Sequence, residues 1–251
     1  VESNREDAHH ARIVIEPCYP GYGLTLGNSL RRVMLSSVEG AAVDAVKIRG
    51  ATHEFSSIPH VKEDVVEIIL NLKQLRVKVH TDERVELKLH ITGKQKVTAA
   101  DIKATSDVTV TNPELYLFST TADDANVEMT IWVKRGRGYE PVEEKDKREF
   151  ELGVIAVDSI FSPVQSVALA TELVRVGQRT DYQRIILDVV TDGTISPEAV
   201  LRDAARALVI QFQAVVDQAS TASEVEFPVE TDQVKDSSEK PKKRVTKKKV
   251  E

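Results

Sequence analysis

The sequence predicts an α+β fold in which a few amphipathic helices pack on largely antiparallel sheet. Two observations lead to this prediction. Near residues 30, 68 and 208 apolar side chains recur with the 3.6-residue period of helices, whereas in the middle of the chain they alternate with the period of two that is typical of half-buried strands. The length of 251 residues suits one large domain or two small ones, and 41 % hydrophobic residues is ordinary for a globular protein.

The N-terminal part of the chain is expected to form a strand, a helix and a second strand, over residues 11–17, 27–38 and 40–48. The helix is predicted from the recurring apolar residues Leu26, Leu30, Val33, Met34 and Val38, with Gly40 as its stop. A second amphipathic helix is expected after Pro59, with one apolar stripe that contains Val61, Val65, Ile68, Ile69, Leu72 and Leu75.

Strands are expected where the period changes to two. Residues 84–91 and 127–133 alternate apolar and polar side chains, which predicts strands with one buried face. Further strands are expected over residues 107–110, 116–119, 152–157, 164–176 and 183–190. Turns are predicted at Asn112-Pro113, at residues 135–138 and at Asp192-Gly193.

The last predicted element is a helix from Pro197 to about Ser220. Ser196 suits the N-cap, Pro197 suits the first helical position, and Glu198 complements the helix dipole in the first turn. Its main apolar stripe contains Leu201, Ala204, Leu208, Phe212, Val215 and Ala219, and a second stripe contains Val200, Ala207 and Ala214. An apolar arc this wide indicates two neighbours, and another subunit is a candidate for the second.

The charge is unevenly distributed along the chain. The formal net charge is −6, but residues 240–251 alone carry +6, so that residues 1–239 carry −12. An acidic body binds phosphate backbones poorly, and direct DNA contact is therefore expected only from the basic tail, weakly. The sequence from about residue 224 onward has no apolar period and is predicted to be disordered. The tail residues predicted to contact DNA are Lys242, Lys243, Arg244, Lys247, Lys248 and Lys249.

The composition excludes several classes of protein. No apolar run reaches the roughly 20 residues of a membrane-spanning helix, and the first residues do not have the pattern of a signal peptide. The single cysteine, Cys18, excludes an internal disulfide and a cysteine-rich metal site, and favours a reducing compartment. The histidines lack metal-ligand spacing and no nucleophile–base pattern is evident, so that no catalytic residue, cofactor or metal is expected on this chain.

Three glycines between the first strand and the first helix superficially resemble a dinucleotide-binding turn. Gly21, Gly23 and Gly27 have the spacing G-x-G-x-x-x-G, and Pro17 and Pro20 interrupt the segment. This spacing differs from the dinucleotide fingerprint and favours a structural strand-to-helix turn.

Two arginine pairs leave alternatives open. Arg31 and Arg32 either contact a partner protein or form ordinary exposed or intrachain ion pairs. Arg135 and Arg137 either touch phosphate or lie in an exposed hairpin loop, and the loop is the favoured interpretation.

The run GYGLTLGNSLRRVMLSS at residues 21–37 resembles the signature helix region of the alpha subunits of bacterial-type multisubunit RNA polymerase. Further blocks match this family in the same order: HEF at 53–55, EDVVEIILNLK at 63–73, VTAADI at 97–102, RGRGY at 135–139, FSPV at 161–164, RTD at 179–181 and DGTISPEAV at 192–200. The resemblance covers nearly all of residues 10–220, which makes it far more specific than one short motif.

The resemblance implies a discontinuous dimerisation subdomain, residues 1–40 and 168–223, made of antiparallel sheet and two amphipathic helices. A mostly β subdomain that binds the large subunits is inserted between them, at residues 41–167, and residues 224–251 form the tail. The dimer interface is expected to contain Leu30, Met34, Leu201, Leu208, Phe212 and Val215.

In this family the dimer receives the beta subunit on one protomer and the beta-prime subunit on the other. By motif position Arg32 corresponds to a beta-contacting arginine, Leu35 to a position tied to beta-prime, and Val164 to another position near the large-subunit surface. A basic contact position of some members falls near residues 81–83, which are not basic here, and is not carried over. The family commonly adds a carboxy-terminal domain that reads promoter DNA. The sequence here ends in a short basic tail instead, which leaves two alternatives open: the domain is missing from this sequence, or a short Lys-rich tail takes its place.

These observations lead to the hypothesis that the chain is a homodimeric scaffold that nucleates RNA polymerase assembly for transcription. It would be a non-catalytic subunit of a nucleotidyltransferase, located in the cytoplasm or in a plastid stroma. The main alternative is a free-standing DNA-binding protein that acts through residues 240–249, and an independent small-molecule enzyme is a more distant one. Deletion of the tail would abolish the function of the DNA-binding protein and spare assembly by the scaffold.

Overall fold

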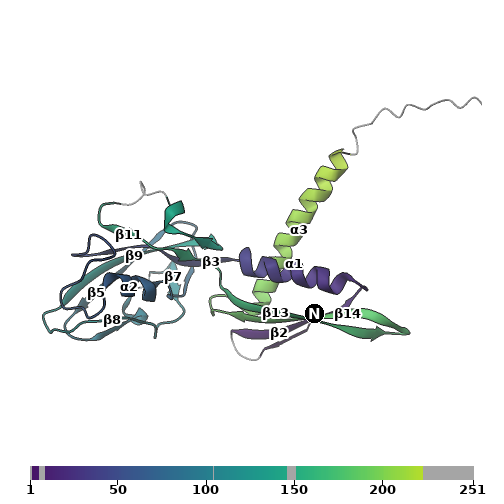
Figure 1. Ribbon diagram of the computed structural model, residues 1–251, viewed down its shortest axis with the longest axis horizontal. Helices are drawn as coiled ribbons and strands as arrows, with labels where there is room; N and C mark the ends of the chain where they lie inside the picture. Colours follow the sequence, from purple (N-terminus) through teal and green to yellow (C-terminus); the bar gives the residue numbers. More distant parts are fainter. Residues whose placement is uncertain (1, 6–8, 104, 146–150, 223–251) are drawn as a thin grey trace, which may run out of the picture. The chain divides into compact units, whose positions relative to one another are not determined.

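The structure, a computed structural model, describes residues 2–5, 9–103, 105–145 and 151–222, and it has the predicted α+β fold (Figure 1). The helices are α1 (Tyr22–Ser36), α2 (Val65–Leu72) and α3 (Pro197–Ala222), with the short 3-10 helices η1 (Ala99–Asp101) and η2 (Val142–Glu144). The strands are β1 (Glu2–Arg5), β2 (His10–Cys18), β3 (Glu39–Ile48), β4 (Val77–Val79), β5 (Val85–Thr92), β6 (Lys96–Thr98), β7 (Val108–Val110), β8 (Tyr116–Ser119), β9 (Asn126–Arg137), β10 (Tyr139–Glu140), β11 (Val154–Ala156), β12 (Ser159–Ile160), β13 (Val164–Val176) and β14 (Arg179–Thr191).

One antiparallel sheet joins the N-terminal strands to residues 164–191, in the order β1-β2-β14-β13. β13 and β14 form a long hairpin, and β2 pairs with β14 although the two strands are far apart in sequence. Helix α1 packs on this sheet and shares a hydrophobic core with it and with the N-terminal half of α3. This core includes Ala11, Ile13, Leu30, Met34, Ile185, Leu187, Val200 and Ala204.

A second antiparallel sheet has the order β11-β3-β9-β5, and three two-stranded sheets (β4-β7, β6-β8 and β10-β12) accompany it. Helix α2 packs against β8, and its Ile68 and Leu72 belong to the same hydrophobic cluster as the inward-facing residues of β5, β8 and β9. The alternation predicted for β5 and β9 is confirmed, since Leu87, Leu89 and Ile131 are buried there.

The chain divides into two compact units, residues 1–212 and 213–251, and the described part of the second unit is the C-terminal end of α3. The subdomain boundaries expected at residues 40 and 168 stay predictions. The tail predicted to be disordered, with its six DNA-contact candidates between Lys242 and Lys249, lies outside the described residues.

Helix α1 begins at Tyr22, five residues earlier than predicted, and ends at Ser36. Gly21, with φ of 83°, is its N-cap, but Gly23 and Gly27 lie inside the helix, so their assignment to a turn was wrong. Both are buried against the β13–β14 hairpin. A Cβ at Gly27 would approach Leu169 Cδ1 to 2.6 Å, and Gly23 N donates a hydrogen bond to Gln183 Oε1 at 2.8 Å. These glycines therefore let the helix lie close to the sheet.

Other element boundaries also differ from the prediction. Helix α2 begins only at Val65, because Val61 forms an isolated bridge with Thr120 in the segment before it. The strands β1, β4, β6, β10 and β12 were not predicted, and all have four residues or fewer. Such short strands give too few alternations to be recognised in a sequence.

Candidate protein-interaction site

Helix α1 presents a charged face next to the face that it buries. Leu30 and Met34 lie in the core, and Arg31 and Arg32 are exposed because successive residues turn by about 100° around the axis. Arg31 Nε donates a hydrogen bond to the carbonyl oxygen of Val167 at 3.0 Å. The Arg32 guanidinium has no hydrogen bond or ion pair within the described part of the chain. Of the two arginines, Arg32 is thus the one available to a partner.

The other two predicted contact residues, Leu35 and Val164, differ in how far they are exposed. Leu35 is 36 % exposed on the same side of α1 as Arg32. Val164 is only 6 % exposed and packs in the core shared with Val167 and Leu30. The Val164 side chain therefore offers a partner almost no surface. Its role near the large subunits, like that of Arg32 and Leu35, stays a prediction.

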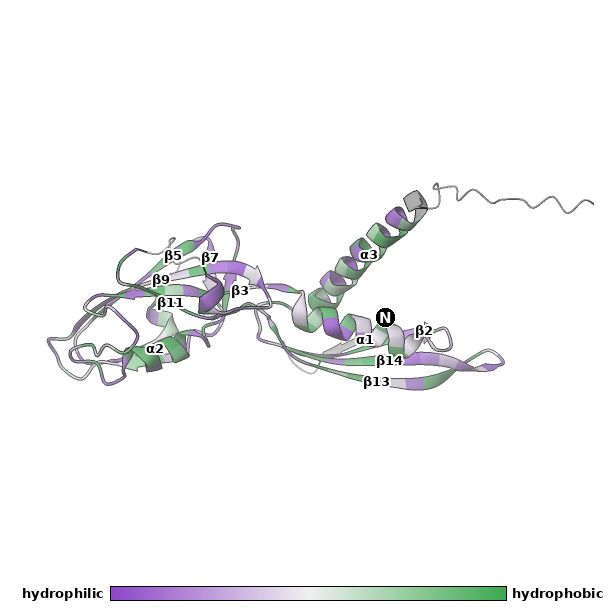
Figure 2. Ribbon diagram, turned by 45° about the horizontal axis from the view of Figure 1, so that its top comes forward, coloured by the Kyte–Doolittle hydropathy of each residue, from purple (hydrophilic) through white to green (hydrophobic). Residues whose placement is uncertain are grey.

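The predicted dimer residues fall into two groups. Leu30 and Met34 are buried within the single chain, and Leu201 and Leu208 are half-buried against the same core. Toward its C-terminal end α3 carries large apolar side chains that are 56–65 % exposed, and green bands mark hydrophobic residues along this helix in Figure 2. The exposed side chains are Val209, Ile210, Phe212, Val215 and Val216. The first half of α3 is thus packed, and its second half has an uncovered apolar surface.

The segment RGRGY does not form the predicted hairpin loop. Arg135, Gly136 and Arg137 lie in β9 and pair with Ala41, Gly40 and Glu39 of β3, respectively. Arg135 is held by ion pairs with Glu39 at 3.1 Å and with Asp82 at 2.8 Å, which speaks against a free phosphate-binding group. Arg137 is exposed. The strand extends this far because Gly136 leaves room for the ring of Phe161, which a Cβ would approach to 2.7 Å.

A buried charge cluster was missed in the sequence. The Asp44 side chain is 4 % exposed, and its carboxylate contacts Lys145 Nζ at 2.8 Å, Lys134 Nζ at 3.1 Å and Arg84 Nε at 3.1 Å. Lys145 also donates to the Ser159 hydroxyl at 2.7 Å and to the Val157 carbonyl. A single carboxylate inside the apolar run AAVDAV was the signal that could have revealed it.

Protonation in this cluster follows from burial and pairing. Burial alone would raise the pKa of Asp44, but hydrogen bonds and positive charge from Lys145 and Lys134 outweigh it and hold that pKa below its ordinary value. Burial lowers the pKa of Lys145, against the opposing effect of Asp44. The pKa of Lys134 is raised, because its hydrogen bonds to Glu140 and Asp44 exceed the opposing effect of burial. Asp44 is therefore ionised at neutral pH, and it holds the cluster together.

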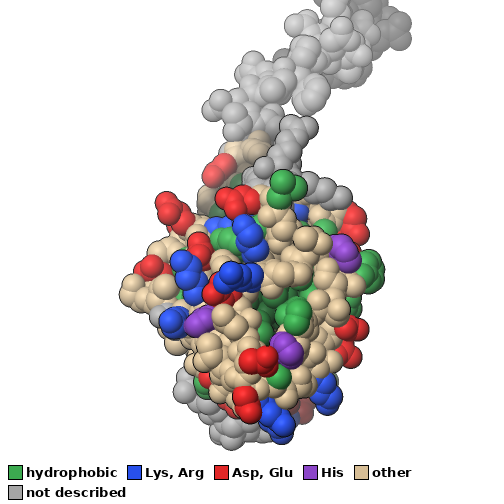
Figure 3. Space-filling view, turned by 90° about the vertical axis from the view of Figure 1, so that its left-hand side faces the viewer, with side chains coloured by type: hydrophobic (Ala, Val, Ile, Leu, Met, Phe, Trp, Pro, Cys, Tyr) green, Lys and Arg blue, Asp and Glu red, His purple; other side chains and the backbone are tan. Residues whose placement is uncertain are grey.

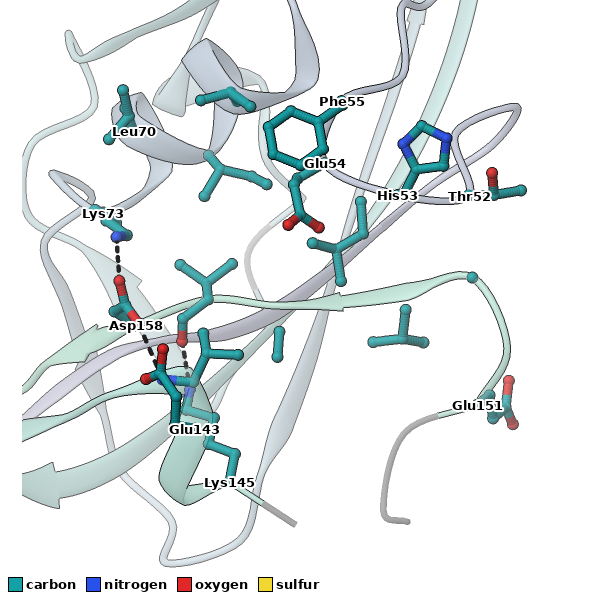
Figure 4. A pocket seen from close by; sticks show the side chains of 18 of the residues that line it. Thr52, His53, Glu54, Phe55, Leu70, Lys73, Glu143, Lys145, Glu151 and Asp158 are labelled. Atoms are coloured by element: carbon teal, nitrogen blue, oxygen red, sulfur yellow. Dashed lines mark hydrogen bonds and ion pairs between the residues drawn. The ribbon is translucent and has the colours of Figure 1, made fainter. Parts of the chain in front are cut away.

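A cavity of about 730 Å³ lies beside α2 (Figure 4). Lys73 and Asp158 form an ion pair of 2.6 Å at one side of it, and this pair lowers the pKa of Asp158. Phe55 and Leu152 are exposed at its rim. On the face shown in Figure 3, apolar side chains lie in patches among acidic, basic and histidine side chains. Within the described residues, no group of three or more His, Cys, Asp or Glu side chains is arranged to hold a metal ion.

Two comparisons with known proteins identify the family of this chain. Residues 46–162, which contain α2, the strands β4 to β12 and the end of β3, match the family described as the RNA polymerase Rpb3/RpoA insert domain. This match defines the class as RNA polymerase subunits with an inserted domain. The DNA-directed RNA polymerase subunit alpha of Carboxydothermus hydrogenoformans is 47 % identical over 213 residues, which are 85 % of this chain and 68 % of the relative. The chain therefore belongs to the family of alpha subunits of bacterial DNA-directed RNA polymerase, and its role lies in transcription. None of the described helices has both the length and the apolar composition needed to cross a membrane.

Proposed function

We propose that this chain forms a homodimer that serves as the assembly scaffold of RNA polymerase, receiving the beta subunit on one protomer and the beta-prime subunit on the other. In this role it is a cytoplasmic, non-catalytic subunit of a nucleotidyltransferase, and the nucleotide and metal sites belong to its partners. The observation that carries the proposal is the uncovered apolar surface of α3.

Five large apolar side chains are more than half exposed between Val209 and Val216. Contiguous apolar surface on this scale marks an interaction site in soluble proteins. Homodimers commonly cover such a surface with its own copy, because a two-fold axis brings the same patch of both chains together. Helix α1 adds Tyr22, Leu24 and Leu26, which are also exposed beyond 40 %. A second copy that covers either helix surface would remove its apolar side chains from water.

The charge distribution favours protein partners over nucleic acid for the surface outside the apolar part of α3. Residues 1–239 carry −12, which disfavours contact with a phosphate backbone. Against this background Arg32 stands out, since it is exposed and unpaired among the described residues. A guanidinium suits carboxylates and backbone carbonyls at a protein interface. This supports Arg32 as the residue that meets the beta subunit, with Leu35 beside it.

Affinity purification of the tagged full chain from cells that express both large subunits tests the proposal. The expected result is a complex that contains two copies of the chain, beta and beta-prime, and that incorporates nucleotides on a DNA template. The purified chain alone is expected to be a dimer in sedimentation and to incorporate none. A monomer that recovers neither large subunit would overturn the proposal.

A further inference from the structure

The end of α1 is joined to the short ribbon formed by β10 and β12. Ser162 Oγ donates a hydrogen bond to the Leu35 carbonyl oxygen at 3.2 Å. On the other side of the junction, a Cβ on Gly138 would lie 3.6 Å from the Ser36 carbonyl oxygen, and Phe161 N donates to the Gly138 carbonyl oxygen at 2.9 Å. The C-terminal end of α1, one turn after Arg32, therefore lies against the residues that flank Gly138 and Phe161.

The β10–β12 ribbon has one buried and one exposed face. Ser159 is completely buried and donates a hydrogen bond to the Val43 carbonyl oxygen at 2.8 Å. Because side chains alternate along a strand, the neighbouring Ile160 points outward, and Tyr139 lies directly opposite it in register. Tyr139 is 58 % and Ile160 is 44 % exposed. An aromatic and an aliphatic side chain thus form a small apolar pair on the surface.

This apolar pair stands on a rigid support. Next to Tyr139, the Glu140 carboxylate forms an ion pair with Lys134 Nζ at 2.9 Å, and Lys134 also pairs with the buried Asp44. At the other end of the segment, the Lys145 ammonium is fixed by Asp44 and Ser159. A side chain on a fixed backbone loses little conformational entropy on binding, and tyrosine has few rotatable bonds to fix.

Two exposed arginines lie near the apolar pair. Arg32 lies on the helical side and Arg137, two residues before Tyr139, lies on the strand side, and both are exposed. Among the described residues neither guanidinium has an ion pair, whereas the nearby carboxylates of Glu39 and Glu140 are already paired with Arg135 and Lys134. These two guanidiniums therefore stand on a body that is acidic as a whole, although η2 adds the exposed Glu143 and Glu144 further along the chain. The complement of the apolar pair and its two arginines is an apolar surface flanked by carboxylates.

We infer that the contact surface for the beta subunit extends from Arg32 and Leu35 across the β10–β12 ribbon, with Tyr139 and Ile160 inserted into an apolar depression of the beta subunit that is flanked by acidic side chains. The inference rests on the proposed function, because it takes Arg32 as the beginning of the interface. Tyrosine and arginine are among the residue types that dominate interface energies, and Tyr139 follows Arg137 by two residues.

The test measures the affinity of the full-length chain for purified beta subunit at several salt concentrations. Tyr139→Ala is expected to weaken binding at least about tenfold, and Tyr139→Phe, which keeps the ring, less than about threefold. Arg137→Ala is expected to flatten the salt dependence. Leu152→Ala, which removes another exposed apolar side chain far along the chain, is the matched control and is expected to bind as the wild type does. Thermal unfolding checks that each variant is folded.

The outcomes separate this inference from the proposed function. Wild-type affinity of Tyr139→Ala, together with loss of binding by Arg32→Ala, would overturn the extended surface and leave the proposed function standing. Failure of the wild-type chain to bind the beta subunit would overturn both. A loss in Tyr139→Ala that Tyr139→Phe shares equally would contradict the apolar anchor, since the ring would then contribute nothing.

Discussion

Asp44→Ala should be among the most destabilising single substitutions in this protein. It removes the carboxylate that contacts three cations and leaves the Lys145 ammonium, whose side chain is 2 % exposed, without a counter-ion. Lys134 keeps its ion pair with Glu140, and Arg84 keeps its stacking on Trp132, 5.0 Å from the ring centre. The loss is therefore concentrated on Lys145. Removal of one partner of a buried pair costs about 3 to 5 kcal/mol of unfolding free energy.

Urea unfolding of the full chain, at one fixed protein concentration, measures this loss of unfolding free energy. Glu151→Ala is the matched control, because it removes a carboxylate from an exposed ion pair with Lys47 and should cost no more than about 1 kcal/mol. The double variant Asp44→Ala/Lys145→Met should recover most of the loss, since it removes the stranded charge as well. If Asp44→Ala costs no more than Glu151→Ala, the reasoning on the buried cluster is refuted.

Four further outcomes are expected. Because the pKa of Asp44 is held below its ordinary value, the stability that it contributes is complete above about pH 4 and is lost as the pH falls below that value, so Asp44→Asn should show a smaller loss than the wild type in acid unfolding. Gly40→Ala should destabilise the fold by about 3 kcal/mol in thermal unfolding, because its Cβ would lie 2.0 Å from the Phe161 carbonyl oxygen; near-wild-type stability would show that this contact relaxes freely. Phe212→Ala should weaken the dimer by about 2 to 4 kcal/mol in sedimentation equilibrium, and an unchanged dimer would place the ring outside the interface. Removal of residues 240–251 should abolish a weak, salt-sensitive DNA binding in fluorescence anisotropy, and equal affinities with and without them would contradict a role for the basic tail.

The sequence predicted the longer elements well, because each repeats its period several times. The strand over residues 164–176 matches β13, and the start of α3 was indicated by Ser196 and Pro197. The beginning of α1 could not be predicted. Gly23 and Gly27 look like turn residues locally, and the reason for them is Gln183 and Leu169, which lie across the helix–sheet contact and about 140 residues or more away in sequence.

The candidate site was only partly predictable for the same reason. The polar side of α1 follows from helical geometry, so the exposure of Arg32 could be inferred from the residues alone. Leu30 and Met34 could face their own sheet or a second copy of the chain, and the sequence cannot distinguish these because both neighbours would present an apolar surface. In the structure the two residues are buried in their own chain. The exposed pair of Tyr139 and Ile160 depends on a two-residue pairing that no periodicity reveals.

The most direct test of the central claim is size-exclusion chromatography of Arg32→Ala co-expressed with the beta subunit. Loss of a guanidinium from a desolvated interface costs roughly 2 to 5 kcal/mol, which weakens binding about 30-fold or more. Since Arg32 is exposed, its loss should leave the fold and the dimer intact. We predict that the wild-type chain elutes as a complex with beta, and that Arg32→Ala accumulates as a dimer of the chain alone. Co-elution of Arg32→Ala with beta at the wild-type yield, or a monomeric wild-type chain, would contradict the account.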